Sequence, residues 1–144
     1  MTIVVAYQET PEGRRALGHA MAEAGLRHTD LVVLTAPSRA DGDPVTRLPE
    51  VPVPRLGGPP AADGAADGSV ATAEHPAVAV HLRNAVKPDH LADELLDLAG
   101  ELDAELIVIG LRRRSPVGKL LLGSAAQHIL LNSTVPVLAV RLPD

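Results

Sequence analysis

The feature that most constrains this chain is the alternation of short apolar runs with segments of helical periodicity. The apolar runs are rich in Val, Ile and Leu, which is typical of strands buried on both faces of a sheet. Strands that alternate with helices predict a mostly parallel sheet with helices on both of its faces. The predicted strands are Ile3–Tyr7, Leu31–Thr35, Ala77–Arg83, Leu106–Ile109 and Val137–Val140.

The first predicted helix follows directly after the first strand. Thr10 is a residue type that caps helix starts, and Pro11 suits the first helical position because its missing N–H would be unpaired there anyway. Small and apolar residues then recur at helical spacing until Gly25, where glycine favours a helix end. We therefore expect a helix from Pro11 to about Gly25.

Two further helices are predicted in the second half of the chain. One begins at Pro88 and extends over about 89–105, with leucines along one face and carboxylates over the rest. The other begins at Ser124, because Ser124 and Gln127 have the spacing of a capping box ahead of an apolar run. Each of these helices lies between two predicted strands, as a parallel sheet requires.

Residues 37–76 differ in composition from the rest of the chain. They hold eight of the thirteen prolines and five of the twelve glycines. Proline removes backbone donors and glycine raises the entropy cost of ordering, so this stretch predicts a long flexible loop. We therefore expect a single domain over residues 1–144 that contains this Pro/Gly/Ala-rich loop.

The composition excludes several classes of protein. The chain has no cysteine, which excludes disulfides and thiolate metal sites. No run approaches the roughly 18 apolar residues of a membrane span, and the N-terminus has no basic leader, so we expect a cytoplasmic protein without a membrane partner. Tyr7 is the sole aromatic residue and the net charge is −5, which argues against a nucleic-acid partner.

The segment Ile107–Ser124, with the sequence IVIGLRRRSPVGKLLLGS, is the strongest candidate for a binding site. It leads from a predicted strand through a basic loop into the start of a predicted helix. Helix starts carry unpaired N–H groups and favour anions, so the segment predicts a phosphate site. The arginines at 112–114 could clamp phosphates, bind another polyanion, pair with the acidic helix or remain solvated.

This segment, extended through the last strand, resembles the universal stress protein family, whose nucleotide-binding members share the pattern G-x2-G-x9-G-[S/T]. Gly110 fits the first glycine of the pattern, and Gly123-Ser124 fit its end at the right spacing. The second glycine is replaced by Arg113. The N-terminal IVVAYQETPEGRRAL and the C-terminal VPVLAV also resemble the family, so the likeness covers residues 1–36 and 77–142.

The resemblance implies a Rossmann-like three-layer α/β domain with a mostly parallel five-stranded sheet. It also implies a homodimer paired through the last strand, Val137–Val140, which would cover an exposed apolar edge. It implies that ATP or AMP binds in the crevice, with Mg²⁺ only alongside ATP and no tightly bound metal. The nucleotide-binding residues that it indicates are Ala6, Tyr7, Gln8, Thr35, Ala36, Ile109, Gly110, Arg113, Gly123, Ser124 and Ala125.

Three departures from the family pattern bear on nucleotide binding. Arg113 cannot mimic the backbone freedom of glycine, although its guanidinium could contact phosphate directly. Gln8 stands at the end of the first strand, near the adenosine moiety, where the family usually has Asp. Tyr7 replaces a smaller aliphatic residue, and its ring could either stack on adenine or fill the adenine pocket.

These observations leave three functions open. The first is an adenine-nucleotide-binding stress-response protein that acts as a homodimeric regulator or sensor. The second is a nucleotide-free interaction module of the same fold. The third is a slow ATP hydrolase, for which Glu9 is the nearest candidate base. We identify no catalytic residue and no metal site, since no two histidines have the i, i+4 spacing of a helical zinc site.

Overall fold

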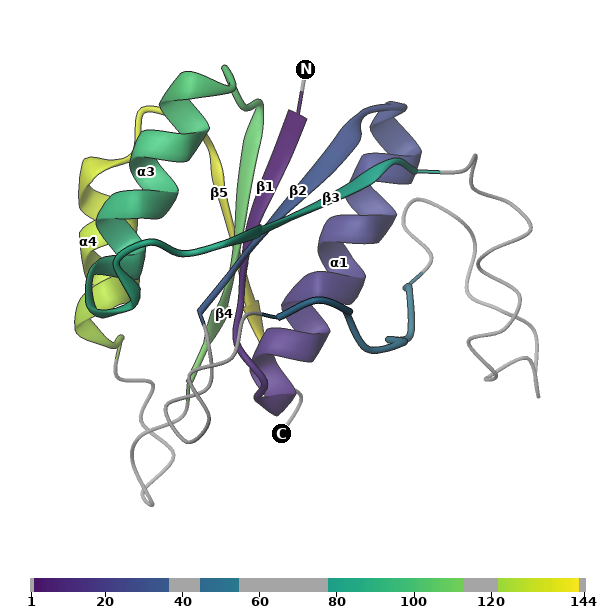
Figure 1. Cartoon of the computed structure of the whole chain (residues 1–144), viewed down its shortest axis with the longest axis horizontal. Coiled ribbons are helices and arrows are strands. Elements are labelled where there is room, and N and C mark those ends of the chain that lie inside the picture. Colours follow the sequence, from purple (N-terminus) through teal and green to yellow (C-terminus); the bar gives the residue numbers. More distant parts are fainter. Residues whose placement is uncertain (1, 37–44, 55–77, 113–121, 143–144) are drawn as a thin grey trace.

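The centre of the protein is an open five-stranded sheet in which every neighbouring pair of strands is parallel (Figure 1). The computed structural model describes residues 2–36, 45–54, 78–112 and 122–142. The strands follow the order β3-β2-β1-β4-β5 across the sheet, so β1 is the central strand and lies between β2 and β4. Their bounds are β1 Thr2–Tyr7, β2 Asp30–Thr35, β3 Val80–Asn84, β4 Leu106–Leu111 and β5 Val137–Arg141.

Helices cover both faces of the sheet, which gives the three layers expected from the sequence (Figure 1). Helix α1, Pro11–Arg27, lies on one face, and helices α3, Leu91–Glu101, and α4, Ser124–Asn132, lie on the other. The fold class predicted from the sequence, a Rossmann-like α/β domain, is confirmed. None of the helices in the described ranges is long and apolar enough to cross a membrane.

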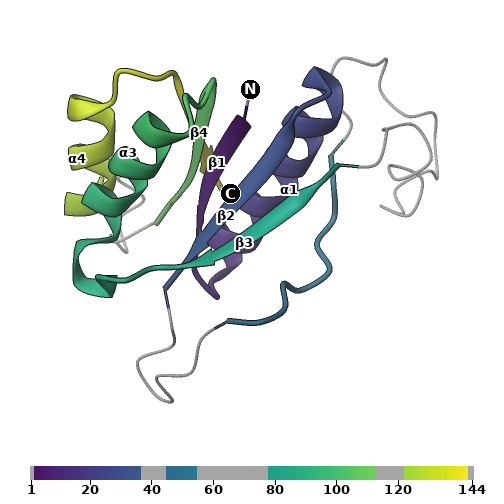
Figure 2. The same cartoon turned by 45° about the horizontal axis from the view of Figure 1, so that its top comes forward.

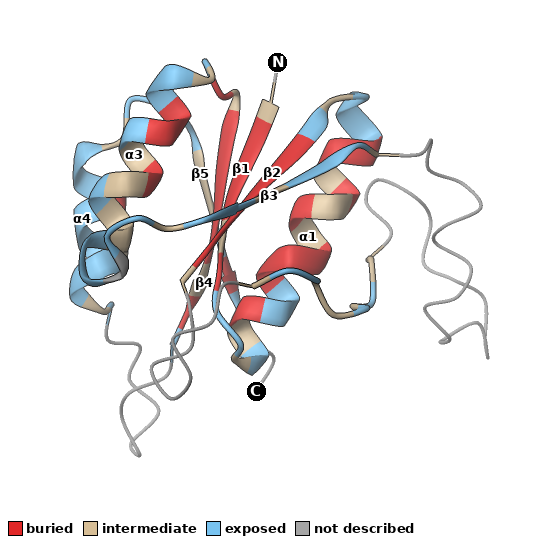
Figure 3. Cartoon of the chain, in the orientation of Figure 1, coloured by how far each residue is buried: buried red, intermediate tan, exposed pale blue. Residues whose placement is uncertain are grey.

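Strand β1 contributes side chains to two separate cores, one on each face of the sheet. Its side chains alternate, so Ile3 and Val5 pack in the cluster under α1, whereas Val4 packs in the cluster under α3 and α4. All three are fully buried. Figure 3 shows red over most of β1 and β2, whereas α4 is largely exposed. A strand buried on both faces has no polar side, which accounts for its uninterrupted apolar sequence.

The edge strand β3 differs from its prediction. A strand was expected at Ala77–Arg83, with alternating or full burial, but β3 runs from Val80 to Asn84. Four of its five residues are exposed, and only Leu82 is half-buried. It lies at the edge of the sheet, where one side of the strand has no neighbour among the described strands.

Helix α1 begins as predicted and ends later than predicted. The Thr10 hydroxyl accepts a hydrogen bond from the Gly13 N–H at 3.0 Å, so Thr10 is the N-cap. The helix continues through Gly25, which is buried, and ends at His28 in a left-handed conformation with φ of 54°. The expected stop at Gly25 is therefore wrong, because the left-handed residue that ends the helix is His28.

The other two helices follow the sequence pattern only in part, because α4 begins at Ser124 as predicted whereas α3 begins later than predicted. A 3-10 turn, η2 Pro88–His90, precedes α3, which ends at Glu101 rather than near residue 105. Helix α4 has Gly123 as its N-cap, so Ser124 is already inside the helix. The Gln127 amide donates to the Leu122 carbonyl at 3.2 Å instead of closing a capping box, and that prediction is wrong.

Residues 45–54 form an irregular strap against the α1 face of the sheet (Figure 2). Leu48 and Val51 pack on the core cluster under α1. The Asn84 side chain holds the start of the strap, because its amide donates to the Val45 carbonyl at 3.1 Å and its oxygen accepts from the Val45 N–H at 2.7 Å. The flexible loop predicted over 37–76 otherwise lies outside the described residues.

Gly18 allows the strap to approach α1. A Cβ atom on Gly18 would lie 2.2 Å from the Pro52 carbonyl oxygen, whereas a Cβ atom on Gly100 in α3 would meet nothing within 4 Å. We expect Gly18→Ala to lower the free energy of unfolding by about 1–3 kcal/mol through overpacking. Gly100→Ala should instead raise it by up to about 1 kcal/mol, since alanine favours helix.

Urea unfolding of the two variants measures this difference. Both substitutions make the same chemical change inside a helix, so their opposite signs would come from the strap alone. Stabilisation of the protein by Gly18→Ala would show that the strap is not packed on α1.

Candidate functional site

A cleft of about 450 Å³ opens at the carboxyl ends of β1 and β4. These strands are neighbours, but the helices that follow them, α1 and α4, lie on opposite faces of the sheet. Such a switch point leaves a crevice because the two connections diverge. The cleft is lined by Ala6, Gln8, Thr10, Glu12, Gly13, Asp89, His90, Leu91, Ala92, Asp93, Ile109, Gly110, Arg112, Ser124, Ala125, Ala126, His128 and Ile129.

The loop from β1 to α1 forms one side of the cleft and has little freedom to move. The Thr10 N–H donates to the Gln8 carbonyl at 2.8 Å, which closes a tight turn. A Cβ atom on Gly13 would lie only 2.0 Å from that same carbonyl oxygen, so glycine is needed for the helix to start this close to the strand. Gln8 is thereby held at the edge of the cleft.

Gly110 forms the floor of the cleft where β4 ends. A Cβ atom there would lie 2.6 Å from the Glu12 carbonyl oxygen, so β4 can reach the first turn of α1 only with glycine at this position. The next residues tie the same two elements together, since Arg112 Nε lies 3.3 Å from Glu12 Oε1. Gly110, the first glycine of the sequence motif, is therefore required because the backbones of β4 and α1 approach closely at this point.

The start of α4 forms a further part of the cleft lining. Gly123 makes no side-chain cap, and the first intrahelical bond of this turn runs from the Gln127 N–H to the Gly123 carbonyl at 3.0 Å. The N–H groups of the preceding turn therefore have no helical partner, and the helix dipole favours negative charge beside them. Ser124 and Ala125 line the cleft at this point and are exposed.

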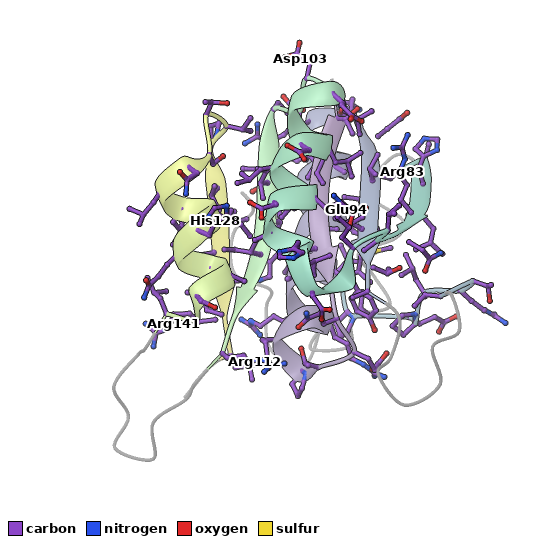
Figure 4. All side chains as sticks on the ribbon, turned by 60° about the vertical axis from the view of Figure 1, so that its left-hand side comes forward. Arg83, Glu94, Asp103, Arg112, His128 and Arg141 are labelled. Carbon is purple, nitrogen blue, oxygen red and sulfur yellow. The ribbon has the colours of Figure 1, made fainter. Side chains whose placement is uncertain are left out.

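The opposite wall comes from η2 and the first turn of α3. It brings Asp89, His90 and Asp93 into the cleft. His128 on α4 reaches across to this wall, with Nε2 2.6 Å from Asp93 Oδ1. Figure 4 shows His128 between the two helices, with Arg112 near the lower end of the cleft. The lining of the cleft therefore combines the start of a helix with carboxylate and imidazole side chains.

Six of the predicted site residues line the cleft, namely Ala6, Gln8, Ile109, Gly110, Ser124 and Ala125. Gly123 is the N-cap of α4 and adjoins them. Thr35 and Ala36 do not line it. The Thr35 side chain is fully buried and donates to Asn84 Oδ1 at 3.0 Å, so it joins β2 to β3 instead. Arg113 lies outside the described residues.

Tyr7 lies on the other face of the sheet from the cleft. Its ring is buried in the cluster under α1, and its hydroxyl donates to Glu9 Oε2 at 2.5 Å. Glu9 in turn accepts from Arg14 Nε at 2.6 Å. The expectation that Tyr7 would stack on adenine or fill its pocket is wrong, because strand alternation directs the neighbouring Ala6 to the cleft.

The loop at Tyr7–Thr10 and the segment from Gly110 to Ser124 are the two loops that the sequence indicates for the crevice. The sequence does not indicate the wall formed by 89–93, nor Glu12 and Gly13 in the first turn of α1. The signal for Gly13 was present, since a glycine just after a helix N-cap points to a close backbone approach. The wall could be found only from the way α3 packs beside α4, which depends on the three-dimensional fold.

No group of three or more His, Asp or Glu side chains that could hold a metal ion occurs among the described residues. A second hollow, of about 400 Å³, lies between α3 and the edge strand β3. Arg83 and Glu94 face it from opposite sides (Figure 4). Glu94 is already engaged, because it accepts the backbone N–H groups of Val86 and Lys87 at 2.8 and 3.0 Å. This hollow contains no helix start among its lining residues.

A parallel sheet with a cleft at its switch point and a helix start in the wall defines a Rossmann-like α/β binding domain. The model of the universal stress protein family matches residues 1–141. The chain therefore belongs to the universal stress protein family.

Related proteins agree with this assignment. The chain is 40% identical over 139 residues to a universal stress protein of Mycolicibacterium smegmatis, covering 96% of each chain. A solved universal stress protein from Archaeoglobus fulgidus is 28% identical with a TM-score of 0.63, covering 96% of this chain and 97% of that one.

Two more distant solved structures share the fold and carry nucleotides. One is the universal stress protein from Archaeoglobus fulgidus in complex with dAMP, at 23% identity and a TM-score of 0.58, with 96% of each chain covered. The other is a universal stress protein in complex with cAMP, at 20% identity and a TM-score of 0.59, with 99% of this chain and 98% of that chain covered.

The ionisation of Tyr7 tests its placement away from the cleft. The pKa of Tyr7 is raised to about 12, mainly by burial of the hydroxyl and next by its hydrogen bond to Glu9. Its folded pKa lies above its unfolded value of about 10, so this contribution to stability is complete below pH ~10 and is lost as the pH rises through about 12.

Because the chain has a single tyrosine, the absorbance of the phenolate follows this one group. We expect native protein to titrate well above pH 10, Glu9→Gln to lower that midpoint, and urea-unfolded protein to titrate near pH 10. Native titration at the ordinary value would place the Tyr7 hydroxyl in solvent.

Proposed function

We propose that this chain binds an adenine nucleotide in the cleft between β1 and β4 and acts as a homodimeric regulator or sensor in the stress response. The observation that carries the proposal is the convergence of Gly110 and the start of α4 on one cleft. Its volume of about 450 Å³ lies within the range of small-molecule sites. Membership of a family with dAMP-bound and cAMP-bound members supports this ligand class.

The lining residues suggest an orientation for the ligand. The phosphate would lie against the backbone N–H groups at Ser124 and Ala125, where an anion meets the positive end of the α4 dipole. Gly110 leaves the backbone open to close approach on the floor. The base and sugar would then extend along β1 beside Ala6 and Gln8, whose amide can both donate and accept hydrogen bonds.

The choice between AMP and ATP belongs to this proposal. Magnesium would enter only with ATP, because the described part of the cleft contains no cluster of three metal-ligating side chains.

Slow ATP hydrolysis has little support, since the carboxylate of Glu9 is bound by Tyr7 and Arg14 and does not line the cleft. A nucleotide-free interaction module predicts a pocket plugged by Tyr7 or by the long loop at 37–76. The Tyr7 ring lies on the other face, and the described part of the loop, residues 45–54, does not line the cleft.

Ala125→Glu tests the position of the phosphate. Glutamate is favourable in the first turn of a helix, so α4 should keep its stability while the new carboxylate repels the ligand phosphate. We expect AMP affinity to fall at least about tenfold, as measured by calorimetry. The matched control is Gln127→Glu, which adds the same charge in α4 at a position outside the cleft lining. Equal effects of the two variants would contradict the proposed phosphate position.

Native protein provides the first measurement. With one tyrosine and no tryptophan, the chain absorbs weakly, so co-purified adenine would dominate the ultraviolet spectrum near 260 nm. Absence of that band, together with no thermal shift on adding millimolar AMP, ATP or cAMP, would contradict nucleotide binding. Nucleotide binding that appears only after Gln8→Asp with Arg113→Gly would favour the nucleotide-free module.

The homodimer is proposed through the free edge of β5. This strand pairs only with β4 among the described strands, and it carries the half-buried apolar residues Val137 and Leu138. Pairing with a second copy would satisfy its backbone groups and cover this edge.

Ala139→Arg places a charge on an exposed position of β5 without altering a buried side chain. We expect sedimentation to shift from twice the mass of one chain to a single chain, with the thermal unfolding of each protomer retained. Leu26→Arg, on an exposed position of α1, is the control that should leave the dimer intact. A monomer in the unaltered protein would contradict this part of the proposal.

A further inference from the structure

The cleft contains carboxylates close to the place proposed for the ligand phosphate. Among the described lining residues, Glu12, Asp89 and Asp93 are acidic. Glu12 is balanced by Arg112, whose Nε lies 3.3 Å from its carboxylate. Among the described residues, Asp93 pairs with no Lys or Arg, and its partner there is the imidazole of His128, with Nε2 2.6 Å from Oδ1. A carboxylate that could turn toward a bound phosphate would oppose binding, so its position matters.

His128 is placed to control where the Asp93 carboxylate lies. It follows Ser124 by four residues, and both side chains line the cleft, so it stands one helical turn from the proposed phosphate position. The Asn132 amide donates to the His128 carbonyl at 2.8 Å and lies 3.3 Å from Nδ1. Because an ionised carboxylate can only accept hydrogen bonds, the His128 Nε2–H donates to Asp93.

We propose that His128 is a positioning residue of the nucleotide site, which holds the Asp93 carboxylate against the middle of α4 and away from the ligand phosphate. The inference rests on the proposed function, since it assigns a role toward a phosphate bound at the start of α4. His128 need not touch the ligand for this role. Its exposed side chain and that of Asp93 contribute little to overall stability, because exposed ion pairs of this kind are weak.

A set of substitutions separates this role from general support of the helix. His128→Leu keeps a side chain of similar size but removes the donor, so Asp93 is free to turn into the cleft. We expect AMP affinity to fall about tenfold while adenosine, which lacks the phosphate, binds as before. His128→Gln retains an amide donor and should preserve AMP binding. Asp93→Asn in the His128→Leu background removes the charge and should restore it.

The protein offers a matched control outside the cleft. His81 Nε2 lies 3.3 Å from Asp30 Oδ2 between β3 and β2, and both side chains are exposed. His81→Leu therefore removes the same type of pair without altering the cleft and should leave the affinities for AMP and adenosine unchanged. Thermal unfolding of each variant checks that it remains folded at the temperature of the titration.

Calorimetric titrations with AMP and adenosine decide the outcome. The proposal is overturned if His128→Leu weakens AMP and adenosine equally, or if Asp93→Asn fails to restore AMP binding in that background, because either result indicates a purely structural clamp. If the unaltered chain binds neither compound, the proposed function fails and this role fails with it. Binding by the unaltered chain with equal losses in the variant rejects the role of His128 alone.

Discussion

The pairing of β1 with β4 is the constraint on which the rest of the molecule depends. The two strands lie side by side in parallel, and each must pass into a helix on a different face of the sheet. Their connections therefore diverge, and the crevice between them cannot be filled by either helix. Gly110 keeps this crevice narrow at its floor, because it lets β4 approach the first turn of α1 within backbone contact.

The two faces of the sheet are completed in different ways. One face carries α3 and α4, and the contacts between these helices set the width of the cleft. The other face carries α1 and the strap at 45–54, which contributes Leu48 and Val51 to the core without forming a helix. The strap is held at its start by Asn84, whose side-chain amide forms hydrogen bonds to both the N–H and the carbonyl of Val45.

Apolar patterning was enough to predict the inner strands and the order of the elements along the chain, because burial on two faces leaves a clear signal in β1, β2 and β4. It also placed Gly110 and Ser124 at the site. It could not tell which face Tyr7 occupies, since one residue of register decides that. Gly25 misled the prediction because glycine also occurs inside helices, and α1 continues to Arg27. The wall at 89–93 could not be predicted, because its position depends on how α3 packs beside α4 and no local sequence pattern specifies that packing.

The lining of the cleft is confined to two stretches of the described chain, residues 6–13 and 89–129. The described elements between α1 and η2, namely β2, β3 and the strap at 45–54, contribute no residue to this lining. Substitutions in these described elements can therefore alter the edge of the sheet, or the packing under α1, while the residues that line the cleft stay the same.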